Sequence, residues 1–239
     1  MLQQKYVIFK DDDVGKDLSN LKKWIDLVLK NNAKAAIGLI GKHLKNNELR
    51  EYLKSLDKDR IEIFCHGYSH SYLPFLEKKF FGKNRIFHAE FDKDLRSHDS
   101  SLKRYRELES QYLGKKAITF GPPGNIWNKS AIDALAQNDF KLMFAWEKIE
   151  HKIFTIPLTS NLKQNSLDEF ISGYENNKND LIYTLQFHHA DLAEKQFKLT
   201  EAVIDFLKNN ENRIFIKPSE LLEISKKDKN ILKRISPKN

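Results

Sequence analysis

Residues 5–13, KYVIFKDDD, join a short run rich in β-branched and aromatic side chains to three consecutive aspartates. Such a run predicts a strand over residues 5–10, with the aspartates directly at its C-terminal end. Residues 18–29 then carry apolar side chains at helical spacing, which predicts a helix. The chain therefore begins with a strand, an acidic loop and a helix.

The same alternation continues to the end of the chain. Further strands are expected at residues 35–40, 60–64, 117–120, 142–144, 153–156, 181–185 and 213–216, and helices at residues 47–56, 90–113, 129–137, 166–174 and 199–209. Strands that alternate with helices over the whole length predict a parallel sheet closed or nearly closed on itself, with seven or eight strand–helix units. Because no Gly/Ser-rich linker interrupts the pattern, we expect one domain over residues 1–225 and a loosely attached tail over residues 226–239.

The amino-acid composition limits the classes of protein to which this chain can belong. Of the 239 residues 40% are hydrophobic and 31% are charged, which is typical of a globular chain. The formal net charge of +8 is spread along amphipathic segments, so a solvated surface explains it better than specific nucleic-acid binding. The absence of an apolar window of about eighteen residues argues against a transmembrane segment. A single cysteine, Cys65, and an N-terminus that runs directly into a strand favour a cytoplasmic location.

Four of the expected strands are followed by polar residues. These are Asp11, Asp12 and Asp13 after the first strand, His66 and His70 after the third, the loop 121–125 after the fourth, and His188 and His189 after the strand at 181–185. In a parallel barrel the C-terminal ends of the strands form one rim, so these side chains are expected to converge there.

The histidine pair has a spacing that metal sites use. In HGYSH, residues 66–70, the i, i+4 spacing puts two imidazoles on one side of a helical turn. Together with a carboxylate they supply three protein ligands and leave an open position for water, as hydrolytic metal sites require. Zinc suits this set, and cobalt, nickel or iron are alternatives. Taken singly, an aspartate run can also be a helix cap, and a histidine pair a purely structural feature.

The order and spacing of FKDDDVG, HGYSH, FGPPGN and LQFHH resemble the polysaccharide deacetylase family, also called the NodB-homology or carbohydrate esterase family 4 group. The resemblance covers residues 6–215 and implies a distorted (β/α)7 TIM-like barrel. It implies His66, His70 and Asp13 as metal ligands and Asp12 as the catalytic base. A shift by one residue would instead assign these two aspartate roles to Asp11 and Asp12.

The last motif, LQFHH, implies His188 as the general acid, with His189 as the alternate. The FGPPGN motif implies one wall of the substrate groove, where Pro123 and Asn125 are candidate substrate contacts, with a simple turn position as the alternative for Asn125.

The chain departs from the family pattern at one position. The family's arginine before the two prolines is Gly121 here. That arginine normally orients the aspartate base, and Lys10 could substitute for it electrostatically. Glu90, Trp127 and Trp146 are further candidates for substrate contact in the groove, although a core or helix-cap position explains each equally well.

The resemblance implies a metal-dependent hydrolase that removes an N-acyl group, acetyl first, from an amino-sugar-containing substrate. An N-acetylated sugar or glycan precursor would fit a cytoplasmic enzyme. Two alternatives stay open: a hydrolase of other non-peptide C–N bonds, and a non-catalytic module on the same fold that binds an anionic glycan or nucleic acid.

Overall fold

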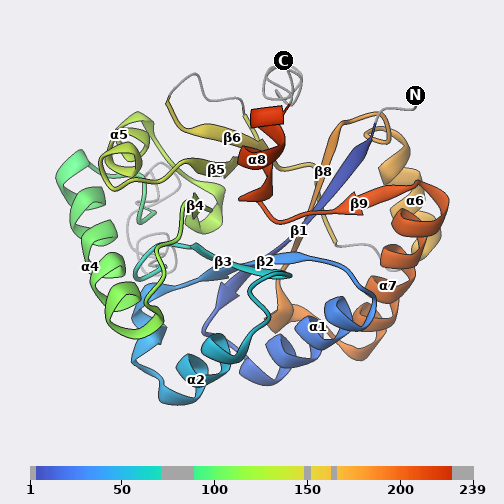
Figure 1. The fold of residues 1–239 in the computed structure, drawn as a ribbon, viewed down its shortest axis with the longest axis horizontal. Coiled ribbons are helices and arrows are strands. Elements are labelled where there is room, and N and C mark those ends of the chain that lie inside the picture. The colour runs from blue at the N-terminus through green and yellow to red at the C-terminus, as the bar shows by residue number, and fades with distance from the viewer. Residues whose placement is uncertain (1–3, 71–88, 148–151, 163–165, 228–239) are drawn as a thin grey trace, which may run out of the picture.

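The computed structural model describes residues 4–70, 89–147, 152–162 and 166–227, in which strands and helices alternate along the chain (Figure 1). The strands are β1 Lys5–Val14, β2 Ala35–Leu39, β3 Ile61–Cys65, β4 Thr119–Phe120, β5 Leu142–Ala145, β6 Phe154–Pro157, β7 Ser160–Asn161, β8 Ile182–Phe187 and β9 Arg213–Phe215. The helices are α1 Leu18–Lys30, α2 Asn47–Ser55, α4 Leu95–Leu113, α5 Lys129–Gln137, α6 Leu167–Glu175, α7 Glu194–Asp205 and α8 Glu220–Lys227. Short helical turns are η1 Gly41–Lys45, η2 Pro123–Asn125, η3 His189–Asp191 and η4 Phe206–Asn210.

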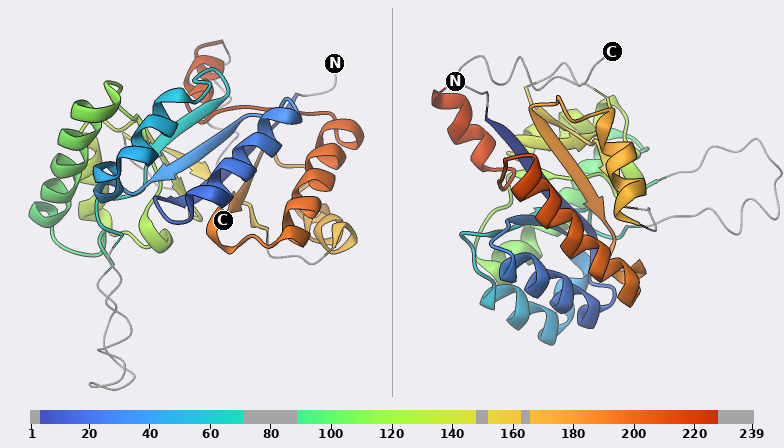
Figure 2. Two further views of the ribbon diagram at one scale, coloured as in Figure 1. Left: turned by 90° about the horizontal axis from the view of Figure 1, so that it is seen from below. Right: turned by 90° about the vertical axis from the view of Figure 1, so that its right-hand side faces the viewer.

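All the strands belong to one parallel sheet. Its order is β6-β5-β4-β3-β2-β1-β8-β7, and β9 pairs with the first residues of β1. Within the described ranges no pairing joins the end strands β6 and β7, so the sheet is curled but not closed. Helices α5, α4, α2, α1, α7 and α6 form an arc around its outside, which both further views also show (Figures 1 and 2). The predicted single α/β domain with a distorted barrel is confirmed.

Two apolar clusters stabilise the two faces of the sheet. The outer cluster joins strand residues such as Phe9 to helix residues such as Trp24 of α1. The inner cluster lies in the concave face and contains Ile8, Phe64 and Phe144, with Leu221 of α8 packed against it. Burying one large apolar side chain contributes about 1.5–3 kcal/mol, so both clusters matter for stability.

The largest differences from the predicted element boundaries occur in β1, α4 and α7. Strand β1 continues through the aspartates to Val14, because β8 pairs with it as far as Asp11 and β2 pairs with Asp11 and again with Val14. Helix α4 begins at Leu95, where Asp94 caps it by accepting a hydrogen bond from the Ser97 amide. Helix α7 begins at Glu194, five residues earlier than expected, and passes into a π-helical turn, η4.

Two further expectations concern the chain as a whole. The expected division at residue 225 falls within α8, and residues 228–239 lie outside the described part, so the tail stays a prediction. None of the helices in the described ranges combines the length and the apolar character needed to cross a membrane.

Candidate metal centre

Strand β1 directs its polar side chains to both faces of the sheet, because successive residues of a strand point to opposite faces. Phe9 belongs to the outer apolar cluster and Ile8 to the inner one. By the same alternation Asp11 is directed to the outer face, and Lys10 and Asp12 to the concave face. All three of these polar residues are buried.

Asp13 breaks this alternation. Its backbone has φ 67°, and the pairing of β1 with β2 shifts register between Asp11 and Val14. A left-handed backbone is uncommon for a residue other than glycine, and an irregular strand end of this kind re-aims a side chain. The carboxylate of Asp13 therefore lies beside His66 and His70 at the C-terminal ends of the strands, instead of following Asp11 to the outer face.

The three predicted metal ligands are close together. Their ligand atoms all lie within 4.8 Å of one another. Oδ1 of Asp13 lies 2.9 Å from Nε2 of His70 and 3.6 Å from Nε2 of His66. Burial opposes ionisation of Asp13, but the two histidines and Lys16 outweigh it and hold the pKa of its carboxyl well below the ordinary value. Asp13 is therefore a carboxylate at neutral pH.

The orientation of His66 suits a metal ligand. Its Nδ1 lies 2.7 Å from the carbonyl oxygen of Gly121 and donates a hydrogen bond to it, which directs Nε2 toward Asp13. Oδ1 of Asp13 is buried and faces the imidazoles of His66 and His70. One carboxylate oxygen and two imidazole nitrogens that converge in this way are the donor set that a divalent transition metal prefers. The residues present therefore fit a metal with Asp13, His66 and His70 as ligands.

The loop that carries the two histidines is not the helical turn that the i, i+4 spacing predicts. Residues 66–70 form an irregular loop wrapped around the carboxylate of Glu90, which accepts hydrogen bonds from the amides of Tyr68, Ser69 and His70 at 2.6–3.2 Å. His70 has φ 48°. The Glu90 carboxylate organises this loop, because it accepts hydrogen bonds from three consecutive backbone amides.

Gly67 is required where this loop meets Glu90. Its backbone has φ 76°, and a Cβ added there would lie 2.8 Å from Oε2 of Glu90 and 2.9 Å from Cγ of Pro123. Only glycine avoids both the backbone strain and the collision.

Replacing Glu90 by Gln is expected to loosen the histidine loop. The variant loses the charge that three amides and the Ser101 hydroxyl share, which should cost about 2 kcal/mol of unfolding free energy, as for hydrogen bonds to a charged group. Metal affinity should fall about 10–100-fold, as for other groups that orient metal ligands. Thermal unfolding and metal titration measure the two effects. Glu107→Gln, an exposed change on α4, is the control, and equal behaviour of the two variants would contradict the assignment.

Asp12 and His188 lie next to the predicted metal ligands. Nε2 of His188 is 4.0 Å from Oδ2 of Asp12, and the His188 side chain is 34% exposed. Oδ2 of Asp12 also accepts a hydrogen bond from the ammonium of Lys10. Burial opposes ionisation, but Lys10 and His66 lower the pKa of Asp12 below its ordinary value, so it is a carboxylate that can accept a proton.

Asp11 and His189, the alternate residues of the sequence analysis, pair with each other. Asp11 accepts hydrogen bonds from the His189 backbone amide at 2.8 Å and from its Nδ1 at 2.6 Å, and both residues are buried. Asn20 of α1 donates to the carbonyl oxygen of His189 at 3.2 Å. This pair anchors the turn after β8. Among the described residues, Asp13 is the aspartate that clusters with the two histidines, and the assignment of the catalytic base stays a prediction.

The site opens into a cavity of about 580 Å³. The sequence prediction named several residues that line this cavity: Asp12, Asp13, His66, His70, Asn125 and His188. The prediction missed other polar residues of the lining, which are Lys16, Lys42, His43, Asn161, Gln186 and Asp191. Pro123 is buried beside Gly67, and Trp127 packs against the outer cluster, so neither lines the cavity. Asn161 follows no recognisable motif, whereas Asp191 stands three residues after His188.

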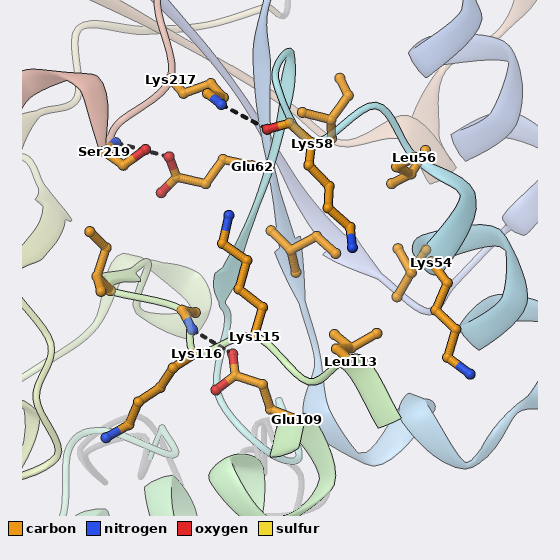
Figure 3. Close-up of a pocket in the computed structure, with 15 residues that line it drawn as sticks. Lys54, Leu56, Lys58, Glu62, Glu109, Leu113, Lys115, Lys116, Lys217 and Ser219 are labelled. Atoms are coloured by element: carbon orange, nitrogen blue, oxygen red, sulfur yellow. Dashed lines mark hydrogen bonds between the residues drawn. The ribbon is translucent and has the colours of Figure 1, made fainter. Parts of the chain in front are cut away.

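A second cavity, of about 170 Å³, lies at the opposite end of β3, near the C-terminal ends of α2 and α4 (Figure 3). Its two carboxylates are already engaged. Glu62 accepts from Thr119 and Ser219, and Glu109 accepts from Arg106 and the Ala117 amide. Among the described residues the metal-ligand cluster occurs at the first cavity alone, so the first cavity is the candidate active site.

Solved structures show that this fold is that of the carbohydrate esterase family 4 (CE4) proteins. A family 4 acetyl xylan esterase from Clostridium thermocellum in complex with a cobalt ion aligns with TM-score 0.65 at 14% identity over 93% of this chain and 92% of that one. A peptidoglycan deacetylase from Bacillus subtilis aligns with TM-score 0.62 at 14% identity over 97% and 96%. The resemblance to polysaccharide deacetylases is thus confirmed for the fold.

A CE4 family pseudoenzyme from Bacillus anthracis has the same fold, with TM-score 0.65 at 14% identity over 92% of this chain. The chain spans 66% of the length of that protein. The fold alone therefore does not decide between enzyme and pseudoenzyme.

Residues 4–172 match the sequence model of glycosyl hydrolase family 57, and the chain belongs to that family. No curated protein matches the chain. The family description and the structural neighbours name different reactions on carbohydrates, so the residues of the site have to discriminate between them.

Proposed function

We propose that this protein is a metal-dependent hydrolase that removes an N-acyl group, acetyl first, from an amino-sugar-containing substrate. The observation that carries the proposal is the cluster of Asp13, His66 and His70, whose ligand atoms lie within 4.8 Å of one another, with a second carboxylate, Asp12, and a partly exposed histidine, His188, beside them. Zinc is the proposed metal, because it prefers this mixed nitrogen and oxygen donor set.

Each side chain has a role in this reaction. Asp13, His66 and His70 would hold a divalent metal, which would supply Lewis acidity at the site. Asp12 takes the proton of the water as its oxygen bonds to the acyl carbon. When the C–N bond breaks, His188 donates a proton to the leaving amine, and acetate and a free amine result. Histidine is the side chain that most often serves as a general acid or base in enzymes.

Metal analysis combined with product analysis tests the proposal. The purified protein is stripped with a chelator, reloaded with zinc, cobalt or nickel, and assayed for acetate release from N-acetylglucosamine oligosaccharides. About one metal per chain and metal-dependent acetate release are expected. A protein that binds none of the three metals, or that binds metal but releases acetate from none of the N-acetylated sugars, would contradict the proposal.

Glycoside cleavage is a second candidate function, favoured by the family match. That reaction uses two carboxyl groups on either side of the glycosidic bond. Asp12 and Asp191 both line the cavity and could supply them. Measuring new reducing ends in the same samples distinguishes the two reactions. Reducing ends without acetate would favour glycoside cleavage, and salt-sensitive binding of an anionic glycan without either product would favour a pseudoenzyme.

A further inference from the structure

Lys10 occupies an unusual position for a lysine. It is fully buried in the concave face of the sheet, where its ammonium lies 5.5 Å from the centre of the Phe64 ring and 5.4 Å from that of Phe144. Burial lowers the pKa of this ammonium, although the neighbouring aspartates oppose the effect. Burying a charge in such surroundings costs free energy unless the charge is paired. The hydrogen-bond partners of Lys10 therefore indicate its role.

The ammonium has two polar partners. It donates to Oδ2 of Asp12 and, at 3.2 Å, to the amide oxygen of Gln186. The amide nitrogen of Gln186 lies 3.4 Å from Nε2 of His188. Lys10 therefore lies beneath the site and links Asp12 to His188 through Gln186.

The two carboxylate oxygens of Asp12 differ in their hydrogen-bond partners. Oδ2 is held by Lys10, whereas Oδ1 is buried, has no hydrogen-bond partner and lies 3.9 Å from Nδ1 of His66. A carboxylate fixed through one oxygen cannot rotate freely, so its second oxygen keeps one direction. Oδ1 is thus the oxygen that remains available to accept a proton.

The neighbouring strand leaves room for this arrangement. A Cβ added at Gly121, directly after β4, would lie 2.6 Å from Cε2 of Phe64 and 3.4 Å from Cε of Lys10. Glycine at this position lets the lysine stem and the Phe64 ring pack together beneath the site.

We propose that Lys10 is a positioning residue that fixes Asp12 through Oδ2, and that Oδ1 of Asp12 is the atom that receives the proton of the attacking water. This inference rests on the proposed hydrolase function and deepens it. Lys10 touches neither the substrate nor the metal ligands in this scheme, and its effect on turnover passes through Asp12 alone.

A double-mutant cycle tests the proposal with Lys10→Met, Asp12→Asn and the combined variant, each loaded with cobalt. Lys10→Met should lower kcat about 10²-fold with KM and cobalt stoichiometry unchanged, which is the scale of a misplaced catalytic group. In the Asp12→Asn background it should have no further effect. Lys5→Met, on the same strand but outside the cavity, is the matched control and should behave as wild type.

Thermal unfolding of the wild type and the three variants of the cycle supplies a readout that does not need turnover. Each single change leaves a buried charge unpaired and should lower Tm, whereas the double change removes both charges and should raise Tm above either single variant. Additive Tm shifts, wild-type kcat in Lys10→Met, or an equal kcat loss in both backgrounds would overturn the proposal. A wild-type protein without turnover would contradict the proposed hydrolase function instead. The Tm values of the four proteins in the cycle would still decide whether Lys10 holds Asp12.

Discussion

His66→Ala/His70→Ala is expected to release the metal and reduce acyl hydrolysis by more than about 10³-fold, because a metal contributes several kcal/mol of charge stabilisation and each 1.4 kcal/mol is tenfold in rate. Asp13 alone cannot hold a transition metal, and both lost imidazoles are ligands in the proposed set. Elemental analysis of the purified variant and acetate release from N-acetylated sugars measure the two losses.

A third histidine provides the control for this double variant. His98 is buried on α4, where it stacks on Phe91 and accepts a hydrogen bond from the Lys93 amide, and it does not line the cavity. His98→Ala should lower stability yet keep its full metal content. If both variants keep their metal, the ligand assignment is wrong; if both lose it, general destabilisation rather than ligand loss explains the result.

Asp12→Asn is expected to lower kcat about 10²–10⁴-fold, the range for removal of a general acid–base group, while the metal content stays the same. Asparagine keeps the shape of the side chain but cannot accept the proton of the attacking water. Metal stoichiometry and kcat measured on one preparation separate this effect from ligand loss.

The outcome for Asp12→Asn distinguishes the two neighbouring aspartates. Asp26→Asn, an exposed change on α1, should leave both kcat and metal content unchanged. Loss of metal in Asp12→Asn would make Asp12 a ligand and would revive the register that assigns the base to Asp11. Unchanged kcat would remove Asp12 from the reaction altogether.

The apolar periodicity of the chain was sufficient to predict the alternation of strands and helices. Residues such as Leu21, Trp24 and Val28 recur on one face of α1 and are buried there, so the local pattern and the tertiary packing agree. The convergence of residues 12, 13, 66, 70 and 188 on one cavity was likewise predictable, since parallel strands end at one rim, whereas Asp11 turns to the outer face.

The details of the site were not predictable from local sequence. Spacing alone suggested a helical turn for residues 66–70, whereas Glu90, twenty residues further along, determines the loop. Trp127 follows the FGPPGN motif closely in sequence but packs against the outer cluster. Contacts between residues far apart in sequence decide both cases, and periodicity carries no information about them.

The irregular end of β1 has a consequence for changes in chain length. Asp11, Asp12 and Asp13 are chemically identical, yet each has a different partner: His189, Lys10 and the histidine loop. Deleting or inserting a single aspartate in this run would barely change the composition but would shift every carboxylate to another partner. The number of residues between Phe9 and Val14 should therefore tolerate change as poorly as the ligands themselves, even though the run looks redundant in the sequence.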